Sequence, residues 1–146
     1  SKGVPGKNVK LMCGKPLVQH AMEQALDAQA AGLVDAVAVS TDSQEILDIA
    51  KKLNVEYCIR RPDEMATDTA SKLPAITHII QTVEAKTGGK LDAIVDLDPT
   101  SPLRNLDDIT GAVALFDLHR PGSVLTGAEA RKSPYFNLME LQDLWL

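Results

Sequence analysis

The feature of this sequence that most restricts its fold is a regular alternation between two apolar patterns. Long segments carry apolar residues every three to four positions, which is the period of a helix packed on one side. Short runs of consecutive apolar and β-branched residues are typical of strands covered on both faces. The patterns predict helices at 16–32, 42–53, 71–87 and 105–119, and strands at 35–41, 55–59, 92–98 and 122–127.

Residues that start and stop helices agree with these boundaries. Pro16 stands in the predicted first turn of the first helix, and Gly32 follows its last turn. Asp42 and Asn105 are the predicted N-caps of the second and fourth helices. Gly88, with another glycine after it, is the predicted stop of the third helix.

Alternating helices and strands predict an α/β fold with a parallel or mostly parallel sheet and helices on both faces. The length of 146 residues fits one domain with a sizeable core. Ligands of such sheets bind beyond the carboxyl ends of the strands, so the loops after the strands are the places to search. The segment 133–141 is expected to be extended as well.

Composition excludes several classes of function. A net charge of −5 and no basic stripe with aromatic residues argue against nucleic acid as a partner. Cys13 and Cys58 form no CxxC motif, which argues against a zinc site and fits a reducing cytoplasm. No apolar run approaches the roughly 20 residues that span a bilayer, so no membrane partner is expected. We therefore expect a cytoplasmic protein.

The first candidate loop is SKGVPGKN, residues 1–8. Its glycines let backbone N–H groups approach an anion, and Lys2 and Lys7 can supply positive charge to phosphate oxygens. It is not a Walker A loop, because Asn8 stands where that motif requires Ser or Thr. The alternative is a solvated terminal segment.

The second candidate loop is RRPDEMATDTAS, residues 60–71. Arg61 lies at the end of a predicted strand, and Asp68 and Ser71 lie just before a predicted helix. Polar groups would then stand beside a positive helix N-terminus, which favours anions. The alternative is that the arginines form surface ion pairs and that Ser71 only caps the helix.

The third candidate loop is DLDPTSPLRN, residues 96–105. Asp96 and Asp98 are two residues apart, so on an extended strand both side chains point to the same face. Such a pair could hold Mg²⁺, which prefers oxygen ligands and bridges to phosphates. The alternative is that one acid is buried and hydrogen-bonded and the other forms a turn before Pro99.

Taken together, the three stretches resemble the acylneuraminate cytidylyltransferase family. That family carries SKGxxxKN, then RPxxLAxDTAS, then PTSPLR, and this chain shows matching residues in that order at 1–8, 61–71 and 99–104. The resemblance implies a three-layer, mostly parallel, Rossmann-like sheet of the nucleotide-diphospho-sugar transferase type. It also implies transfer of CMP from CTP to a nonulosonic acid with release of pyrophosphate, and Mg²⁺ as cofactor.

The resemblance implies a role for each matching residue. Lys2 and Lys7 would be catalytic, holding the triphosphate and stabilising the departing pyrophosphate. The substrate-binding residues would be Gly3, Asn8, Arg61, Asp68, Ala70, Ser71, Asp98, Ser101 and Arg104. Asn8 and Arg61 would hold the nucleotide, and Ala70 and Ser71 would lie near the cytosine. The acidic end of the third stretch would face the sugar or a metal ion held by Asp98 and Asp96.

Some features depart from the family pattern. The family's first strand would precede Ser1, and its dimerisation and metal-binding segment would follow Leu146. We therefore expect residues 1–146 to form one domain that lacks these two segments and is inactive by itself. At full length, we expect a homodimer. Lys72 follows Ser71 where members specific for N-acetylneuraminate have a second serine, and Asp98 replaces a neutral amide, a pattern closer to legionaminate-type members. The alternatives are another sugar nucleotidyltransferase, such as one for 3-deoxy-manno-octulosonate, and a non-catalytic nucleotide-binding module.

Overall fold

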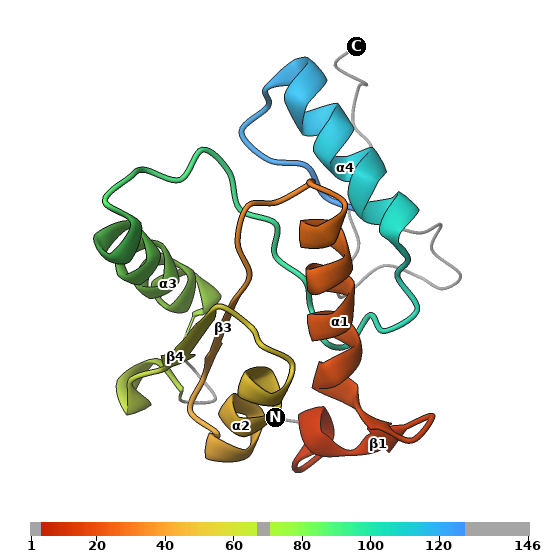
Figure 1. Cartoon of the computed structure of the whole chain (residues 1–146), viewed down its shortest axis with the longest axis vertical. Helices are drawn as coiled ribbons and strands as arrows, with labels where there is room; N and C mark the ends of the chain where they lie inside the picture. The colour runs from red at the N-terminus through yellow and green to blue at the C-terminus, as the bar shows by residue number, and fades with distance from the viewer. Residues whose placement is uncertain (1–3, 67–70, 128–146) are drawn as a thin grey trace.

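A computed structural model describes residues 4–66 and 71–127 of the chain (Figure 1). In chain order the elements are η1 (Lys7–Val9), β1 (Leu11–Met12), β2 (Lys15–Pro16), α1 (Leu17–Ala30), β3 (Ala38–Thr41), α2 (Gln44–Lys52), β4 (Tyr57–Arg60), η2 (Asp63–Met65), α3 (Lys72–Thr87) and α4 (Leu106–His119). No helix in these ranges combines the length and the apolar character needed to cross a lipid bilayer.

The centre of the fold is a parallel pair of strands, β3 and β4, joined by α2 (Figure 1). Their register runs from Ala38 opposite Tyr57 to Thr41 opposite Arg60. Helix α2 packs against both strands, α1 packs against α2, and α3 contacts β3. The predicted α/β class with parallel strands is therefore confirmed, although the described residues contain two parallel strands rather than a full sheet.

The hydrophobic core lies between α1, α2 and the segments that lead into the two strands. Its buried members are Val18, Met22, Val37, Ile46, Ala50 and Val55. Ala50 is completely buried, as expected for the face of α2 that carries apolar residues at helical spacing. This core places the carboxyl ends of β3 and β4, and the loops that follow them, at one edge of the molecule.

Most predicted helix ends are confirmed, with two local corrections. Helix α3 stops at Gly88, whose φ of 72° is left-handed, and Asn105 caps α4 in a capping box with Asp108. The N-cap of α2 is Ser43 rather than Asp42, because Ser43 is extended and its hydroxyl accepts the Ile46 N–H. Pro16 is the residue before α1, not part of its first turn.

The predicted strands at 92–98 and 122–127 are wrong for the structure as described. Neither segment has a hydrogen-bonded strand neighbour among the described residues, and a strand cannot satisfy its backbone groups alone. Ile94 and Leu125 are 49% and 69% exposed, so neither segment is covered as a central strand would be. The predicted extended segment at 133–141 lies outside the described residues.

The hairpin of β1 and β2 was not predicted from the sequence. Its strands pair antiparallel, and Cys13 and Gly14 between them both have positive φ, 52° and 80°. Two left-handed residues are what a tight hairpin turn requires, and glycine in the second position was the available signal. His20 of α1 holds this hairpin, since its Nε2 lies 2.9 Å from the Met12 carbonyl oxygen.

Candidate functional site

The loop that precedes β1 is a tight 3₁₀ turn that fixes Lys7 and Asn8. The Lys7 N–H donates to the Val4 carbonyl at 3.1 Å, and the Val9 N–H donates to the Gly6 carbonyl at 3.1 Å. Gly6 has a φ of 63°, a left-handed conformation that glycine adopts without strain. The turn places Lys7 beside a hollow of about 250 Å³ that is also lined by Val4, Lys10, Leu11, Met12 and Leu17.

Asn8 carries a polar atom without a partner inside the protein. Its side-chain Oδ1 is buried and accepts no hydrogen bond in the part of the chain that the structure describes. A buried polar atom left unpaired costs about 1–3 kcal/mol. The nucleotide-binding role of Asn8 stays a prediction.

Arg61 lies at the carboxyl edge of the sheet, where the sequence predicted it. Its N–H donates to the Thr41 carbonyl at 2.9 Å and extends the pairing of β4 with β3. Its Nη2 donates to the Ser40 carbonyl at 2.6 Å, and its Nε donates to the Ser40 hydroxyl at 3.3 Å. The sheet therefore holds this guanidinium in place, while its Nη1 makes no hydrogen bond with the part of the chain that the structure describes.

Ser71 caps α3, as the alternative for this residue predicted, while its contact with the nucleotide stays a prediction. Its hydroxyl oxygen accepts the Leu73 N–H at 3.4 Å. A hydroxyl that accepts can also donate, because its proton is not used by the cap. The cap and the predicted contact near the cytosine are therefore compatible.

Lys72 is the first residue of α3 and forms an ion pair with Asp96. A cation at a helix N-terminus is disfavoured by the helix dipole, and a carboxylate neighbour offsets this. The pair connects the start of α3 to the segment 92–98, which lies far away in sequence. In the sequence, Lys72 is distinguished only as a departure from the family pattern, and no local signal indicates its pairing with Asp96.

Asp98 stands where charges from the separate stretches meet. Its partial desolvation favours the neutral acid, but hydrogen bonds from the hydroxyl and N–H of Thr100 and the charges of Lys72 and Lys7 outweigh this effect. The pKa of the Asp98 carboxyl is therefore below its usual value. Lys7 lies in the first candidate stretch, Lys72 directly follows the second, and Asp98 lies in the third. The fold therefore brings these parts of the chain close enough for both lysine charges to act on Asp98.

The contacts of the two acids decide how well they suit Mg²⁺. Asp98 Oδ1 accepts the Thr100 N–H at 2.8 Å and the Thr100 hydroxyl at 2.7 Å, which confirms the turn-forming alternative for this acid. Asp96 is paired with Lys72. The described ranges contain no group of three or more His, Cys, Asp or Glu side chains that could hold a metal ion. Mg²⁺ usually binds through one or two carboxylates together with water and substrate phosphates, so the magnesium site at Asp96 and Asp98 stays a prediction.

Arg104 and Gln24 form a cluster that holds the third loop against α1. Arg104 Nη2 donates to the Asp98 carbonyl at 3.2 Å, and its Nη1 donates to Gln24 Oε1 at 3.0 Å. Gln24 Nε2 donates to the carbonyls of Pro102 and Arg104 at 2.9 and 2.5 Å. Gln24 was not predicted, since no local pattern links a glutamine in α1 to a loop about 80 residues later.

The remaining predicted residues divide into two groups. Ser101 is exposed, and its backbone N–H donates to the Asp98 carbonyl at 3.2 Å, so it belongs to the same turn. Lys2, Gly3, Asp68 and Ala70 lie outside the described residues. The structure thus brings together Lys7, Asp98 and Lys72, and places Ser71 and Asp96 next to Lys72.

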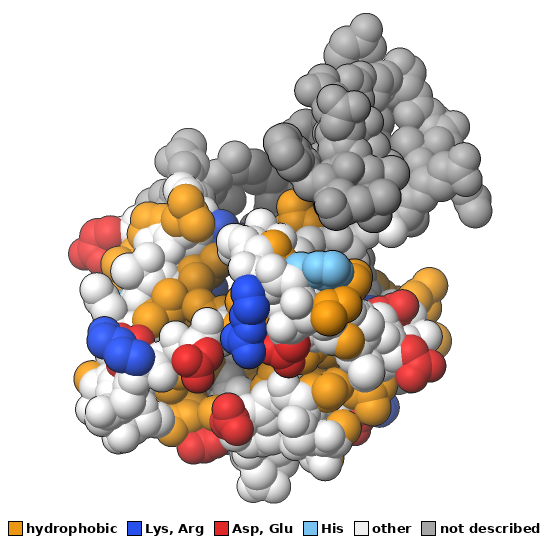
Figure 2. All heavy atoms as spheres, turned by 90° about the horizontal axis from the view of Figure 1, so that it is seen from above, with side chains coloured by type: hydrophobic (Ala, Val, Ile, Leu, Met, Phe, Trp, Pro, Cys, Tyr) orange, Lys and Arg blue, Asp and Glu red, His pale blue; other side chains and the backbone are white. Residues whose placement is uncertain are grey.

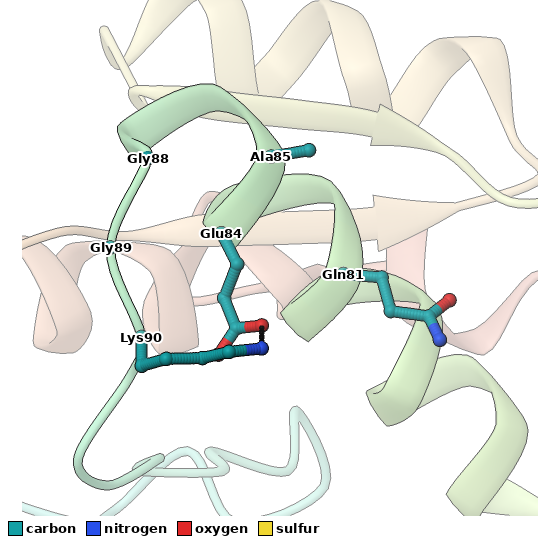
Figure 3. A pocket seen from close by; sticks show the side chains of 6 residues that line it. All are labelled: Gln81, Glu84, Ala85, Gly88, Gly89 and Lys90. Atoms are coloured by element: carbon teal, nitrogen blue, oxygen red, sulfur yellow. Dashed lines mark hydrogen bonds and ion pairs between the residues drawn. The ribbon is translucent and has the colours of Figure 1, made fainter.

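A second hollow, of about 420 Å³, lies at the other end of α3 (Figure 3). It is lined by Gln81, Glu84, Ala85, Gly88, Gly89 and Lys90. Glu84 is fully engaged there, because its carboxylate pairs with Lys90 at 2.6 Å and accepts the Leu91 N–H at 3.1 Å. Along α3, the lining residues from Gln81 to Gly88 lie about 14 to 24 Å from Lys72, so the hollow is not part of the site.

In α/β domains with parallel strands, ligands such as nucleotides bind in the loops beyond the carboxyl ends of the strands, and Arg61 and the start of α3 lie in this region. The sequence profile of the cytidylyltransferase family matches residues 1–116, and the chain belongs to this family.

Similar proteins carry related names. The chain is 34% identical to "post-translational flagellin modification protein B" of Campylobacter coli and 32% identical to "CMP-N,N'-diacetyllegionaminic acid synthase" of Campylobacter jejuni, in each case over 98% of this chain and 60% of the relative. It is 33% identical to "N-acylneuraminate cytidylyltransferase" of Escherichia coli over 80% of this chain and 26% of that protein. The chain therefore spans less than two thirds of the length of these relatives.

Proposed function

We propose that the protein transfers CMP from CTP to a nonulosonic acid and releases pyrophosphate. The observation that carries this proposal is the ion pair of Lys72 with Asp96, which joins the start of α3, directly after the second stretch, to the third stretch. The charge of Lys7, from the first stretch, also acts on Asp98 two residues further on. Family membership supports the reaction class, and the names of the relatives support the sugar class.

In this reaction the anomeric hydroxyl of the sugar attacks the α-phosphate of CTP, and the bond to the pyrophosphate oxygen breaks. Negative charge develops on the phosphate oxygens and on the leaving pyrophosphate, so fixed cations are the main catalytic contribution. Lys7, held in its 3₁₀ turn, is the described residue that supplies this charge. Asn8, the next residue in the same turn, contacts the nucleotide.

The rest of the expected site remains part of the proposal. Lys2, Gly3, Asp68 and Ala70 complete the phosphate and cytosine contacts, and Arg61 and Ser71 hold the nucleotide from the sheet edge and the helix cap. Mg²⁺ dependence, a homodimer, a cytoplasmic location and the three-layer Rossmann-like sheet are expectations of the same resemblance. No step above depends on the metal.

The preferred sugar follows from the charge at Asp98. A carboxylate only accepts hydrogen bonds, whereas the amide expected in enzymes for N-acetylneuraminate also donates. The relatives named for diacetyllegionaminic acid come from Campylobacter jejuni and Legionella pneumophila, at 32% identity in each case. We therefore expect a legionaminate-type sugar to be preferred over N-acetylneuraminate.

The test is pyrophosphate release by the complete gene product, comparing CTP with UTP and legionaminate-type sugars with N-acetylneuraminate and 3-deoxy-manno-octulosonate. The expected result is release that requires both CTP and a nine-carbon keto acid. Release with the octulosonate alone would point to the alternative sugar nucleotidyltransferase. CTP binding without release from any sugar would point to a non-catalytic module.

A further inference from the structure

The loop 98–104 has little hydrophobic anchoring of its own. Leu103, its largest apolar side chain, is 89% exposed. Pro99 and Pro102 have no N–H groups, so the loop has few backbone donors with which to fold onto itself. Its internal bonds are those from Thr100 and Ser101 to Asp98 and a long one of 3.4 Å from the Arg104 N–H to the Ser101 carbonyl.

The loop is held instead by one side chain of α1. Gln24 uses both ends of its amide, since Nε2 donates to the Pro102 and Arg104 carbonyls and Oε1 accepts from Arg104 Nη1. Gln24 and Arg104 are both half-buried, which shields these bonds from competing water. Arg104 in turn restrains the backbone at Asp98, because its Nη2 donates to the Asp98 carbonyl at 3.2 Å.

We propose that Gln24 is a positioning residue that sets the place of Asp98 and Ser101 in the site, acting through Arg104 and the loop backbone. This inference rests on the proposed function, which assigns that loop to the sugar. It also gives Arg104 a specific role, since both of its terminal nitrogens bind within the protein. The cluster explains how a loop without apolar anchoring can present a carboxylate in a defined place.

The first experiment measures the loop directly, by hydrogen exchange of peptides covering 98–105 in the complete gene product. Gln24→Ala should make the Thr100 and Ser101 amides exchange about fivefold faster or more, because their acceptor Asp98 is no longer restrained. The matched control is Gln29→Ala. Gln29 lies on the same helix and donates to the Asp35 carbonyl at 3.0 Å, away from the loop, so loop exchange should be unchanged.

The second experiment measures pyrophosphate release. Gln24→Ala should lower kcat/KM for the sugar by about tenfold or more, with KM for CTP within about twofold, because a displaced group loses its catalytic geometry. Gln24→Glu should behave like Gln24→Ala, since a carboxylate keeps the acceptor for Arg104 but loses the donor to the two carbonyls.

These measurements separate the inference from the proposed function. Unchanged loop exchange in Gln24→Ala, or wild-type kinetics in Gln24→Glu, would overturn the positioning role. A loss of thermal stability alone, with exchange and kinetics unchanged, would also overturn it. If the wild-type protein released no pyrophosphate with any sugar, the proposed function would fail, and faster loop exchange would still show that Gln24 holds the loop.

Discussion

Lys7 and Asp98 show how single residues acquire a role from their surroundings. Lys7 is fixed by a 3₁₀ turn that depends on the left-handed Gly6. Asp98 is fixed by the hydrogen bonds from Thr100, and its charge is stabilised by lysines from two other parts of the chain. Two predictions at this scale test these charges separately.

Replacing Lys7 by alanine should reduce catalysis far more than stability. We expect kcat/KM for pyrophosphate release to fall by about 10²-fold or more, because a cation that stabilises the leaving group is lost. The control is Lys51→Ala, at an exposed position in the last turn of α2, which should stay within about twofold of wild type. A loss of less than a few-fold for Lys7→Ala would contradict the assigned role.

The Asp98 charge should stabilise the protein only above acid pH. Because its folded-state pKa lies below the unfolded value near 3.8, this stabilisation is present above the unfolded pKa and is lost as the pH falls through the folded pKa. Asp98→Asn keeps the acceptor for the turn but removes the charge, so the variant should be less stable at pH 7 by under about 1 kcal/mol, since the site is solvent-accessible.

Urea denaturation at a series of pH values checks this prediction. The difference in unfolding free energy between wild type and Asp98→Asn should be constant from pH 7 to about 5 and then shrink at lower pH. A difference that grew as the pH fell would mean that the folded-state pKa is raised rather than lowered.

At the scale of elements, helix boundaries depend on a few local residues. Helix α3 begins at the Ser71 cap and ends at Gly88, and α4 begins at the capping box of Asn105 and Asp108. These contacts join residues only two to four positions apart in sequence. This is why the sequence predicted most of the helix ends, while the two errors, at the starts of α1 and α2, were local and small.

Two glycines offer a matched test of helix termination. Gly88→Ala should destabilise the protein by about 1 kcal/mol, because alanine must adopt the left-handed φ of 72°. Gly111→Ala, in the middle of α4 with open space around the position of its Cβ, should stabilise it by about 0.5–1 kcal/mol. Urea denaturation of both variants measures the two changes in unfolding free energy. If both substitutions stabilised the protein, or both destabilised it, the conformational explanation would be contradicted.

At the scale of the whole molecule, the hydrophobic core lies between α1, α2 and the segments that lead into β3 and β4, whereas α4 exposes apolar residues. Leu115 and Leu118 of α4 are 51% and 74% exposed. Figure 2, viewed from the top of Figure 1, shows hydrophobic side chains among charged ones on this face. Stability should therefore depend mainly on the cluster between α1, α2 and the strands.

This distribution predicts unequal effects of two similar truncations. Ile46→Ala removes a buried side chain of the core cluster and should cost about 2–5 kcal/mol of unfolding free energy. Leu118→Ala removes an exposed side chain and should change it by less than about 0.5 kcal/mol. Chemical denaturation of both variants checks the prediction, and equal losses would show that α4 is buried in solution.

The sequence by itself determined the four described α-helices, the parallel strands β3 and β4, and the order of the three loops. These depend on caps, glycine stops and apolar periods, all of which act between residues close together in the chain. Only the tertiary structure decided that 92–98 is not a strand, since pairing requires a neighbour from elsewhere. It also decided that Lys72 meets Asp96 and that Gln24 holds the third loop, because both contacts join side chains far apart in sequence, whose meeting depends on how the helices pack.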